Sequence, residues 1–132
     1  MKNFAKLAVL LFVVLSVNIF AQQGQPAQQN IKPTLTAGDL VFAANLLNTV
    51  ELRGGEVDAF MQVKEALKPY LEKIQKEKLQ TGSNIEMTLP IGTAQNILTF
   101  MERGKIAGAD AERYKRIIDS FMAAAKAVSG QK

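Results

Sequence analysis

The chain of 132 residues contains neither cysteine nor histidine. Without cysteine there is no disulfide framework and no thiol to carry a lipid anchor, so the fold depends on packing alone. The two absences together exclude Ser-His and Cys-His nucleophilic pairs, most zinc sites and the commonest general base. An enzyme would have to work with carboxylates, lysines and tyrosines. The sequence therefore favours a non-enzymatic protein that needs no cofactor.

Long apolar runs are also missing, except at the very beginning. Lys2 and Lys6 form a basic start, residues 7–15 are apolar, and residues 16–21 lead to a small residue, Ala21. This order is typical of a secretory signal peptide. Even residues 7–21 comprise only 15 positions, and a membrane-spanning helix needs about 20. We expect a signal peptide over residues 1–21, export to the periplasm or the medium, and no stable membrane span after cleavage.

Net charge is small once the signal peptide is removed. Two of the 16 basic residues lie within it and none of the 12 acidic ones do, which leaves a net charge of +2. So small a net positive charge provides little electrostatic attraction for a phosphate backbone, and we expect no nucleic-acid partner. Residues 22–29 are rich in glutamine and are expected to form a disordered tether. The remaining residues, 30–132, are enough for one ordinary domain with a single core.

An internal repeat is the most informative pattern in the chain. Residues 30–38 read Asn-Ile-Lys-Pro-Thr-Leu-Thr-Ala-Gly, and residues 84–92 read Asn-Ile-Glu-Met-Thr-Leu-Pro-Ile-Gly, 54 positions later. Gly54 and Gly108 match at the same offset, as do many apolar positions between them. A fixed period of this kind indicates duplication, with repeats over residues 30–80 and 84–130. The alternative is that two unrelated amphipathic hairpins happen to share a hydrophobic register.

Each repeat is expected to contain two helices, over about residues 37–53 and 56–78 in the first and 91–103 and 110–128 in the second. Thr36 and Asp39 are spaced as a capping box, in which the Asp39 carboxylate reaches back to the backbone of Thr36. Pro69 predicts a kink in the second helix, because it removes one backbone bond and crowds the preceding turn. The expected core stripes are Leu40, Ala43, Ala44, Leu47 and Val50, widened by Phe42 and Leu46; Val57, Phe60, Met61, Leu67, Leu71 and Ile74, with Val63 at the edge; Ala94, Ile97, Leu98 and Met101; and Ala111, Tyr114, Ile117, Ile118, Phe121, Met122, Ala125 and Val128.

These patterns predict an all-α, four-helix domain made of two duplicated helical hairpins related by pseudo-two-fold symmetry. Each hairpin has an apolar face that it cannot bury alone, and its near-copy is the natural complement. The repeated lead-ins, residues 30–38 and 84–92, are candidates for a minimal two-stranded antiparallel ribbon packed on the helices.

Three clusters of side chains were weighed as sites, and none is assigned a catalytic, cofactor-binding or metal-binding role. The acidic cluster could bind a hard cation, but acids at helix starts are explained by the helix dipole. The basic cluster could bind an anion, but neighbouring acids indicate a mixed-sign surface. The methionine and phenylalanine cluster could enclose an amphiphile, with core packing as the default. The clusters are Glu56, Asp58, Asp110 and Glu112; Arg103, Lys105, Arg113, Lys115 and Arg116; and Met61, Met101, Met122, Phe60, Phe100 and Phe121.

The resulting expectation is an exported, non-enzymatic helical domain that binds another macromolecule, such as a protein partner, or self-associates. The alternative expectation is a carrier that holds a small amphiphile or lipid between the two hairpins. The sequence does not identify the partner or ligand.

Overall fold

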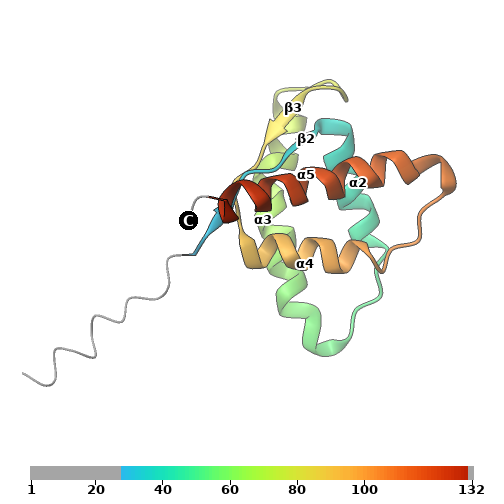
Figure 1. Cartoon of the computed structure of the whole chain (residues 1–132). Coiled ribbons are helices and arrows are strands. Elements are labelled where there is room, and N and C mark those ends of the chain that lie inside the picture. The colour runs from blue at the N-terminus through green and yellow to red at the C-terminus, as the bar shows by residue number, and fades with distance from the viewer. Residues whose placement is uncertain (1–27, 131–132) are drawn as a thin grey trace, which may run out of the picture.

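The computed structural model describes residues 28–130, which form four helices and two small two-stranded antiparallel sheets (Figure 1). The expected signal peptide (1–21) and residues 22–27 of the expected tether lie outside the described residues. Short 3-10 turns at Gly54–Glu56 and Gly108–Asp110 lead into the two longer helices. The helices are α2 (Ala37–Asn48), α3 (Val57–Lys76), α4 (Ile91–Met101) and α5 (Ala111–Ser129). The mainly helical class expected from the sequence is confirmed.

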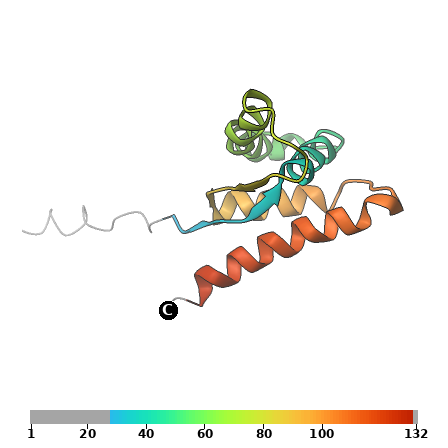
Figure 2. The same cartoon turned by 90° about the horizontal axis from the view of Figure 1, so that it is seen from above.

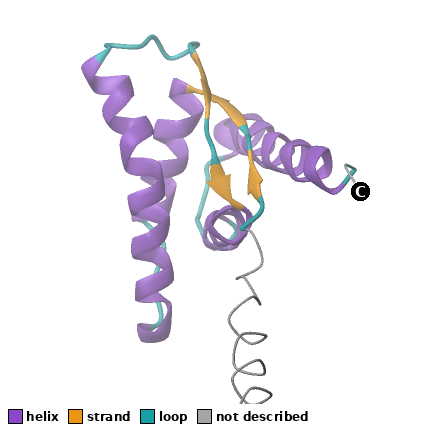
Figure 3. Cartoon of the chain, turned by 90° about the vertical axis from the view of Figure 1, so that its left-hand side faces the viewer, coloured by secondary structure: helices purple, strands orange, loops and turns teal. Residues whose placement is uncertain are grey.

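The two lead-ins pair with each other, as expected. Strand β1 (Asn30–Ile31) is antiparallel to β4 (Leu89–Pro90), and β2 (Thr34–Thr36) is antiparallel to β3 (Asn84–Glu86). The residue numbers of every pair add to 120, so both sheets belong to one continuous register. We call residues 29–37 and 83–91 together the ribbon. Figure 3 shows it crossing between the α2–α3 pair and α5.

Pro33 explains why the ribbon is assigned as two sheets. The Met87 amide donates to the Pro33 carbonyl oxygen at 2.9 Å. Proline has no backbone N–H, so the second hydrogen bond of this pair, from residue 33 to the Met87 carbonyl, is absent. The ladder resumes on both sides and continues past the strand ends. Ala37 N–H donates to the Ser83 carbonyl at 2.8 Å, and Ile91 N–H donates to the Gln29 carbonyl at 2.9 Å.

One face of the ribbon belongs to the core. Side chains alternate along a strand, and here the inward ones are apolar and buried while the outward ones are polar. The inward set comprises Ile31, Pro33, Leu35, Ile85, Met87 and Leu89. The outward set includes Lys32, Thr34, Glu86 and Thr88. The ribbon therefore contributes to the same hydrophobic core as the helices.

Two hydroxyl groups tie the edges of the ribbon to the long helices. Ser120 of α5 accepts a hydrogen bond from Thr34 N–H at 3.1 Å and donates to the Thr34 carbonyl at 2.7 Å. Tyr70 of α3 accepts from Thr88 N–H at 2.9 Å and donates to the Thr88 carbonyl at 3.2 Å. Both threonines sit at positions where the ladder turns its backbone groups outward. The hydroxyls thus supply the partners that a third strand would otherwise provide.

Helices from the two halves of the chain pack on each other. α2 and α4 each contact the other three helices, and the Phe60 ring of α3 meets the Phe100 ring of α4 edge-on, with centroids 5.3 Å apart. Seen from above, α3 and α5 lie on opposite sides of α4 (Figure 2). The core is therefore shared between the halves.

Several helix boundaries differ from the predicted ones. α2 ends at Asn48, and the Thr49 hydroxyl donates to the Leu46 carbonyl at 2.7 Å. α4 ends at Met101. At Gly104 an added Cβ would lie 2.7 Å from Leu46 Cγ, so this glycine permits a close approach between segments. α3 continues through Pro69 to Lys76, so the helix does not end at the proline, as predicted.

The predicted stripes were too wide on the two long helices. In α3 the fully buried position is Val63, which we expected only at the stripe's edge, while Val57 and Met61 are 44% and 51% exposed. In α5 only Ile117 and Phe121 are buried, and Met122 is exposed. Each long helix lies at the outside of the domain. Only a narrow face of α3 and of α5 therefore packs against the core, and the rest of the predicted stripe is exposed to solvent.

Replacing Tyr70 with phenylalanine should lower the free energy of unfolding by about 1 kcal/mol, because two hydrogen bonds to the ribbon are lost and water reaches the freed groups. Urea unfolding measures this change. Tyr114→Phe is the matched control, since the Tyr114 hydroxyl makes no hydrogen bond within the described residues, and it should be nearly neutral. Equal effects of the two substitutions would contradict the role given to Tyr70.

Candidate functional site

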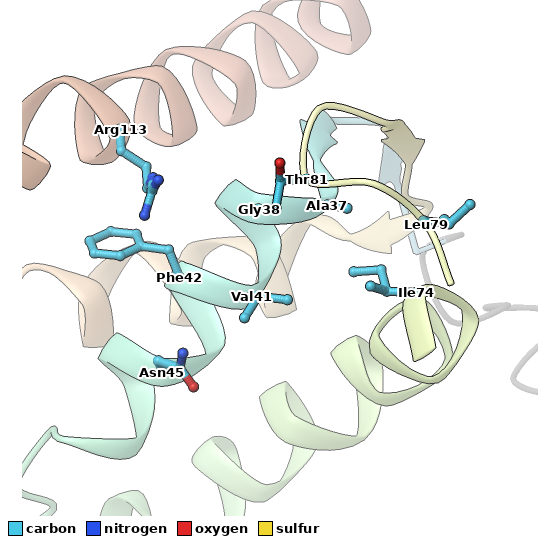
Figure 4. A pocket seen from close by; sticks show the side chains of 9 residues that line it. All are labelled: Ala37, Gly38, Val41, Phe42, Asn45, Ile74, Leu79, Thr81 and Arg113. Atoms are coloured by element: carbon cyan, nitrogen blue, oxygen red, sulfur yellow. The ribbon is translucent and has the colours of Figure 1, made fainter. Parts of the chain in front are cut away.

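A cleft of about 300 Å³ lies beside α2. We call it the α2 cleft, and Figure 4 shows the side chains around it, with Arg113 and Phe42 at one end and Ile74 and Leu79 at the other. Three parts of the chain build it: the outer face of α2, the end of α3 with the loop that follows, and Arg113 of α5. The lining residues are Ala37, Gly38, Val41, Phe42, Asn45, Ile74, Leu79, Thr81 and Arg113.

The floor of the α2 cleft follows from helical spacing and from the loop that follows α3. Gly38, Val41, Phe42 and Asn45 recur at three- and four-residue intervals, which places them on one side of α2. The Gly38 amide donates to the Thr81 carbonyl at 2.9 Å, which fixes the loop against the start of the helix. A Cβ on Gly38 would lie 3.2 Å from that carbonyl oxygen, so a larger residue here would crowd the loop.

A buried carboxylate stands behind the cleft. Asp39 is 4% exposed and is the only buried charged residue in the described part of the chain. Its amide donates to Thr36 Oγ1 at 3.1 Å, as the capping box predicted. The expectation that its carboxylate reaches back to Thr36 is wrong, because α5 supplies stronger partners. Arg116 Nη2 donates to Oδ1 at 2.9 Å and Arg116 Nε donates to Oδ2 at 3.3 Å.

Arg113 closes one end of the cleft. Its Nε lies 3.5 Å from Asp39 Oδ1 and its Nη1 lies 3.8 Å from Asp110 Oδ1. The guanidinium also sits 5.5 Å from the centroid of the Phe42 ring, an arrangement favoured by cation–π attraction. With 44% of its side chain exposed, Arg113 presents a positive charge at the end of an apolar trough.

The equivalent positions in the second half of the chain do not reproduce this site. At the 54-residue offset, Val41 and Phe42 correspond to Gln95 and Asn96. Arg113 corresponds to Ala59 of α3, so α3 carries no cation at the matching position. Asp39 becomes Thr93, so the buried carboxylate has no counterpart either. The apolar floor of the α2 cleft is thus specific to α2, whereas the core positions around it are apolar in both halves.

The four acidic residues considered as a cation site do not come together. Arg103 Nη1 donates to both carboxylate oxygens of Glu56 at 2.8 Å, and Arg53 N–H donates to Oε2 at 2.8 Å. The Arg53 amide, followed by the Arg103 side chain, lowers the pKa of Glu56 below its ordinary value. Asp110 is engaged with Arg113. Over residues 28–130 no three acidic side chains are grouped closely enough to hold a metal ion.

The basic cluster is largely divided among acidic partners. Arg103 binds Glu56, Arg113 and Arg116 approach Asp39, and Lys115 Nζ donates to Asp119 Oδ2 at 2.6 Å. The structure therefore places these cations at several separate ion pairs. Lys105 lines a second, polar hollow of about 440 Å³, together with Thr49, Glu51 and Arg103.

The methionine and phenylalanine cluster is also divided. Phe60, Phe100, Phe121 and Met101 are buried in the core, whereas Met61 and Met122 are exposed on the outer faces of α3 and α5. Of the two tyrosines, Tyr70 binds the ribbon. Burial raises the pKa of Tyr114, and Glu102 adds to the effect.

Of the cleft residues, only Arg113 was considered for a site from the sequence, as part of the basic cluster, and the mixed-sign surface was preferred there. A usable signal was present, because comparison of the two halves shows apolar Val41 and Phe42 against polar Gln95 and Asn96 on otherwise matching helices. The parts contributed by Leu79 and Thr81 could not be found this way, since their loop has no counterpart within the second half.

Comparison with protein-family models, curated proteins and solved structures yields no match to this chain. Among the described helices, none has both the length and the apolar character needed to cross a membrane. The functional argument therefore depends on the geometry of the chain itself.

Asp39→Asn should lower the free energy of unfolding by about 1–2 kcal/mol, since the charge-assisted bonds to Arg116 are weakened while both arginines keep access to water. Thr93→Ala, at the equivalent position of α4, is the control and should be nearly neutral. Chemical denaturation of the two variants decides the point, and an unchanged midpoint for Asp39→Asn would contradict a stabilising role for the buried pair.

Proposed function

We propose that this protein is an exported, non-enzymatic binding domain whose binding site is the α2 cleft. The observation that carries the proposal is the one-sidedness of the cleft. The two halves agree in apolar character at their core positions, but Val41 and Phe42 of α2 correspond to Gln95 and Asn96 of α4. The apolar cleft that Arg113 of α5 closes is therefore built beside α2 and is not repeated by the sequence of α4. Val41 is exposed on α2 where the matching position of α4 carries glutamine, and a ligand in the cleft would account for an apolar residue at this position.

Export and the non-enzymatic character are supported by the sequence. Lys2, Lys6 and the apolar residues 7–15 have the order of a signal peptide. A chain with no histidine or cysteine lacks the residue types used by most nucleophilic and general-base mechanisms.

The occupant we favour is another macromolecule, in the form of a protruding apolar group from a protein partner. Val41 is 39% exposed, so covering its exposed part would contribute a share of the about 1.5–3 kcal/mol that full burial of a valine side chain provides. Self-association through the same cleft is included in this proposal. A small amphiphile is the alternative occupant, favoured by the cation at the end of the trough. Its place would then be the α2 cleft, because the space between the halves is filled by core side chains.

We further propose that the two halves, residues 30–80 and 84–130, are copies related by pseudo-two-fold symmetry. The pairing of Asn30 with Pro90 and of Thr36 with Asn84 supports this, because a two-fold relation with an offset of 54 exchanges these two pairs. The starts of α2 and α4, and of α3 and α5, differ by the same offset.

The proposal is tested by retrieving bound species from the envelope fraction of the producing cell with the tagged mature protein. Val41→Gln, which installs the residue of the second half, should reduce recovery about tenfold. The reciprocal exchange Gln95→Val, on the equivalent face of α4, should leave recovery unchanged. Native mass spectrometry and sizing then distinguish a protein partner, a second copy and an amphiphile.

Two results would overturn the proposal. Equal recovery by wild type and Val41→Gln would remove the α2 cleft as the site. Turnover of a substrate by the pure protein, abolished by changing a single carboxylate, would replace the binding domain with an enzyme.

A further inference from the structure

Arg113 has hydrogen-bonding capacity that its neighbours leave unused. Both Asp39 oxygens already accept hydrogen bonds from Arg116, at 2.9 and 3.3 Å. Arg113 approaches the same carboxylate only to 3.5 Å and Asp110 only to 3.8 Å, which are ion-pair distances rather than hydrogen bonds. Within the described residues the Arg113 side chain makes no hydrogen bond, although a guanidinium carries five N–H donors.

The position of Arg113 directs that capacity toward the cleft. Its guanidinium is held over the ring of Phe42, and both residues line the end of the trough (Figure 4). The backbone amides at the start of α2 offer no competing anion site, because Ala37 N–H is bound to Ser83 and Gly38 N–H to Thr81. An anion in the cleft would therefore meet Arg113 as its donor.

The other end of the cleft is apolar. Val41, Ile74 and Leu79 line it, and Val41 is exposed on the outer face of α2. An apolar chain lying here would remove these side chains from water, and its far end would reach the guanidinium. A cationic head group would be repelled by Arg113, and a neutral acceptor would form a weaker hydrogen bond with it than an anion does.

We propose that the α2 cleft binds an aliphatic carboxylate, with its chain along Val41, Ile74 and Leu79 and its head group on Arg113. This assignment rests on the proposed binding function of the α2 cleft and, of its two candidate occupants, takes the small amphiphile and names its chemical class. A carboxylate matches the two parallel N–H groups of a guanidinium, which favours a bidentate contact. The volume of about 300 Å³ lies at the lower end for ligand pockets, so a chain of medium length fits and a long one would protrude.

The test is a titration of the isotope-labelled mature protein with decanoate, below the concentration at which it forms micelles, followed by NMR of the backbone amides. Shifts should concentrate at Gly38, Val41, Asn45 and Thr81. Decanol has the same chain without the charge, and its affinity should be lower by a factor of about ten or more. The reason is that a hydrogen bond to a charged group contributes about 1.5–3 kcal/mol.

Variants of α5 test whether the charge of Arg113, and not that of a neighbouring cation, is responsible for binding the carboxylate. Arg113→Gln should weaken decanoate binding about tenfold and leave decanol binding unchanged. Lys115→Gln is the matched control, because it removes one positive charge from the same helix at a residue engaged with Asp119, and it should keep wild-type affinity. Arg113→Lys, which keeps the charge but loses the fork, should fall between them.

The outcomes distinguish the ligand class from the function. Equal binding of decanoate by wild type and Arg113→Gln, or equal binding of decanoate and decanol, overturns the assignment of a carboxylate. Absence of decanoate binding, with recovery of a protein partner that still depends on Val41, also overturns it and leaves the proposed function standing. Absence of both overturns the two together.

Discussion

The register of the ribbon is the constraint on which the rest of the structure depends. α2 begins directly after Thr36 and α4 directly after Pro90, so the pairing of the lead-ins sets where both central helices start. Side chains alternate along a strand, and a slip by one residue would turn Ile31, Leu35, Ile85 and Leu89 from the core to the solvent. Burial of those four side chains holds the register, and Tyr70 and Ser120 attach its edges to the long helices.

The sequence differences between the two halves that matter for the α2 cleft lie on α2 itself. Its first turn carries Asp39, whose carboxylate is buried beneath two arginines of α5, and its outer face carries Val41 and Phe42. The corresponding positions of α4 are threonine, glutamine and asparagine. A buried carboxylate is costly unless charged donors satisfy it, and here it also holds the arginine-bearing face of α5 close to α2. The same contact therefore positions the cation at the end of the α2 cleft.

Much of the fold follows from local pattern and from the 54-residue offset. Four helices, their order and the antiparallel contact of the lead-ins could be predicted, because hydrophobic periodicity and the repeated segment (residues 30–38 and 84–92) are visible in the sequence itself. The partners of Asp39 could not, since local spacing favoured a bond back to Thr36 and Arg116 lies far away in sequence. The exposure of Val57 and Met61 was missed for a related reason, because periodicity marks an apolar face but the packing of α3 decides which part of it meets the core. The cleft depends on a loop whose path no periodicity describes.

The central claim is that the two lead-ins form one ribbon in a single register, and NMR of the mature protein tests it most directly. Opposite residues in non-hydrogen-bonded antiparallel pairs have Cα atoms about 4.5 Å apart, close enough for strong contacts between their Hα protons. Such contacts are predicted between Asn30 and Pro90 and, equally, between Thr36 and Asn84. Contacts at only one of these pairs, or at pairs displaced by one residue, would contradict the account.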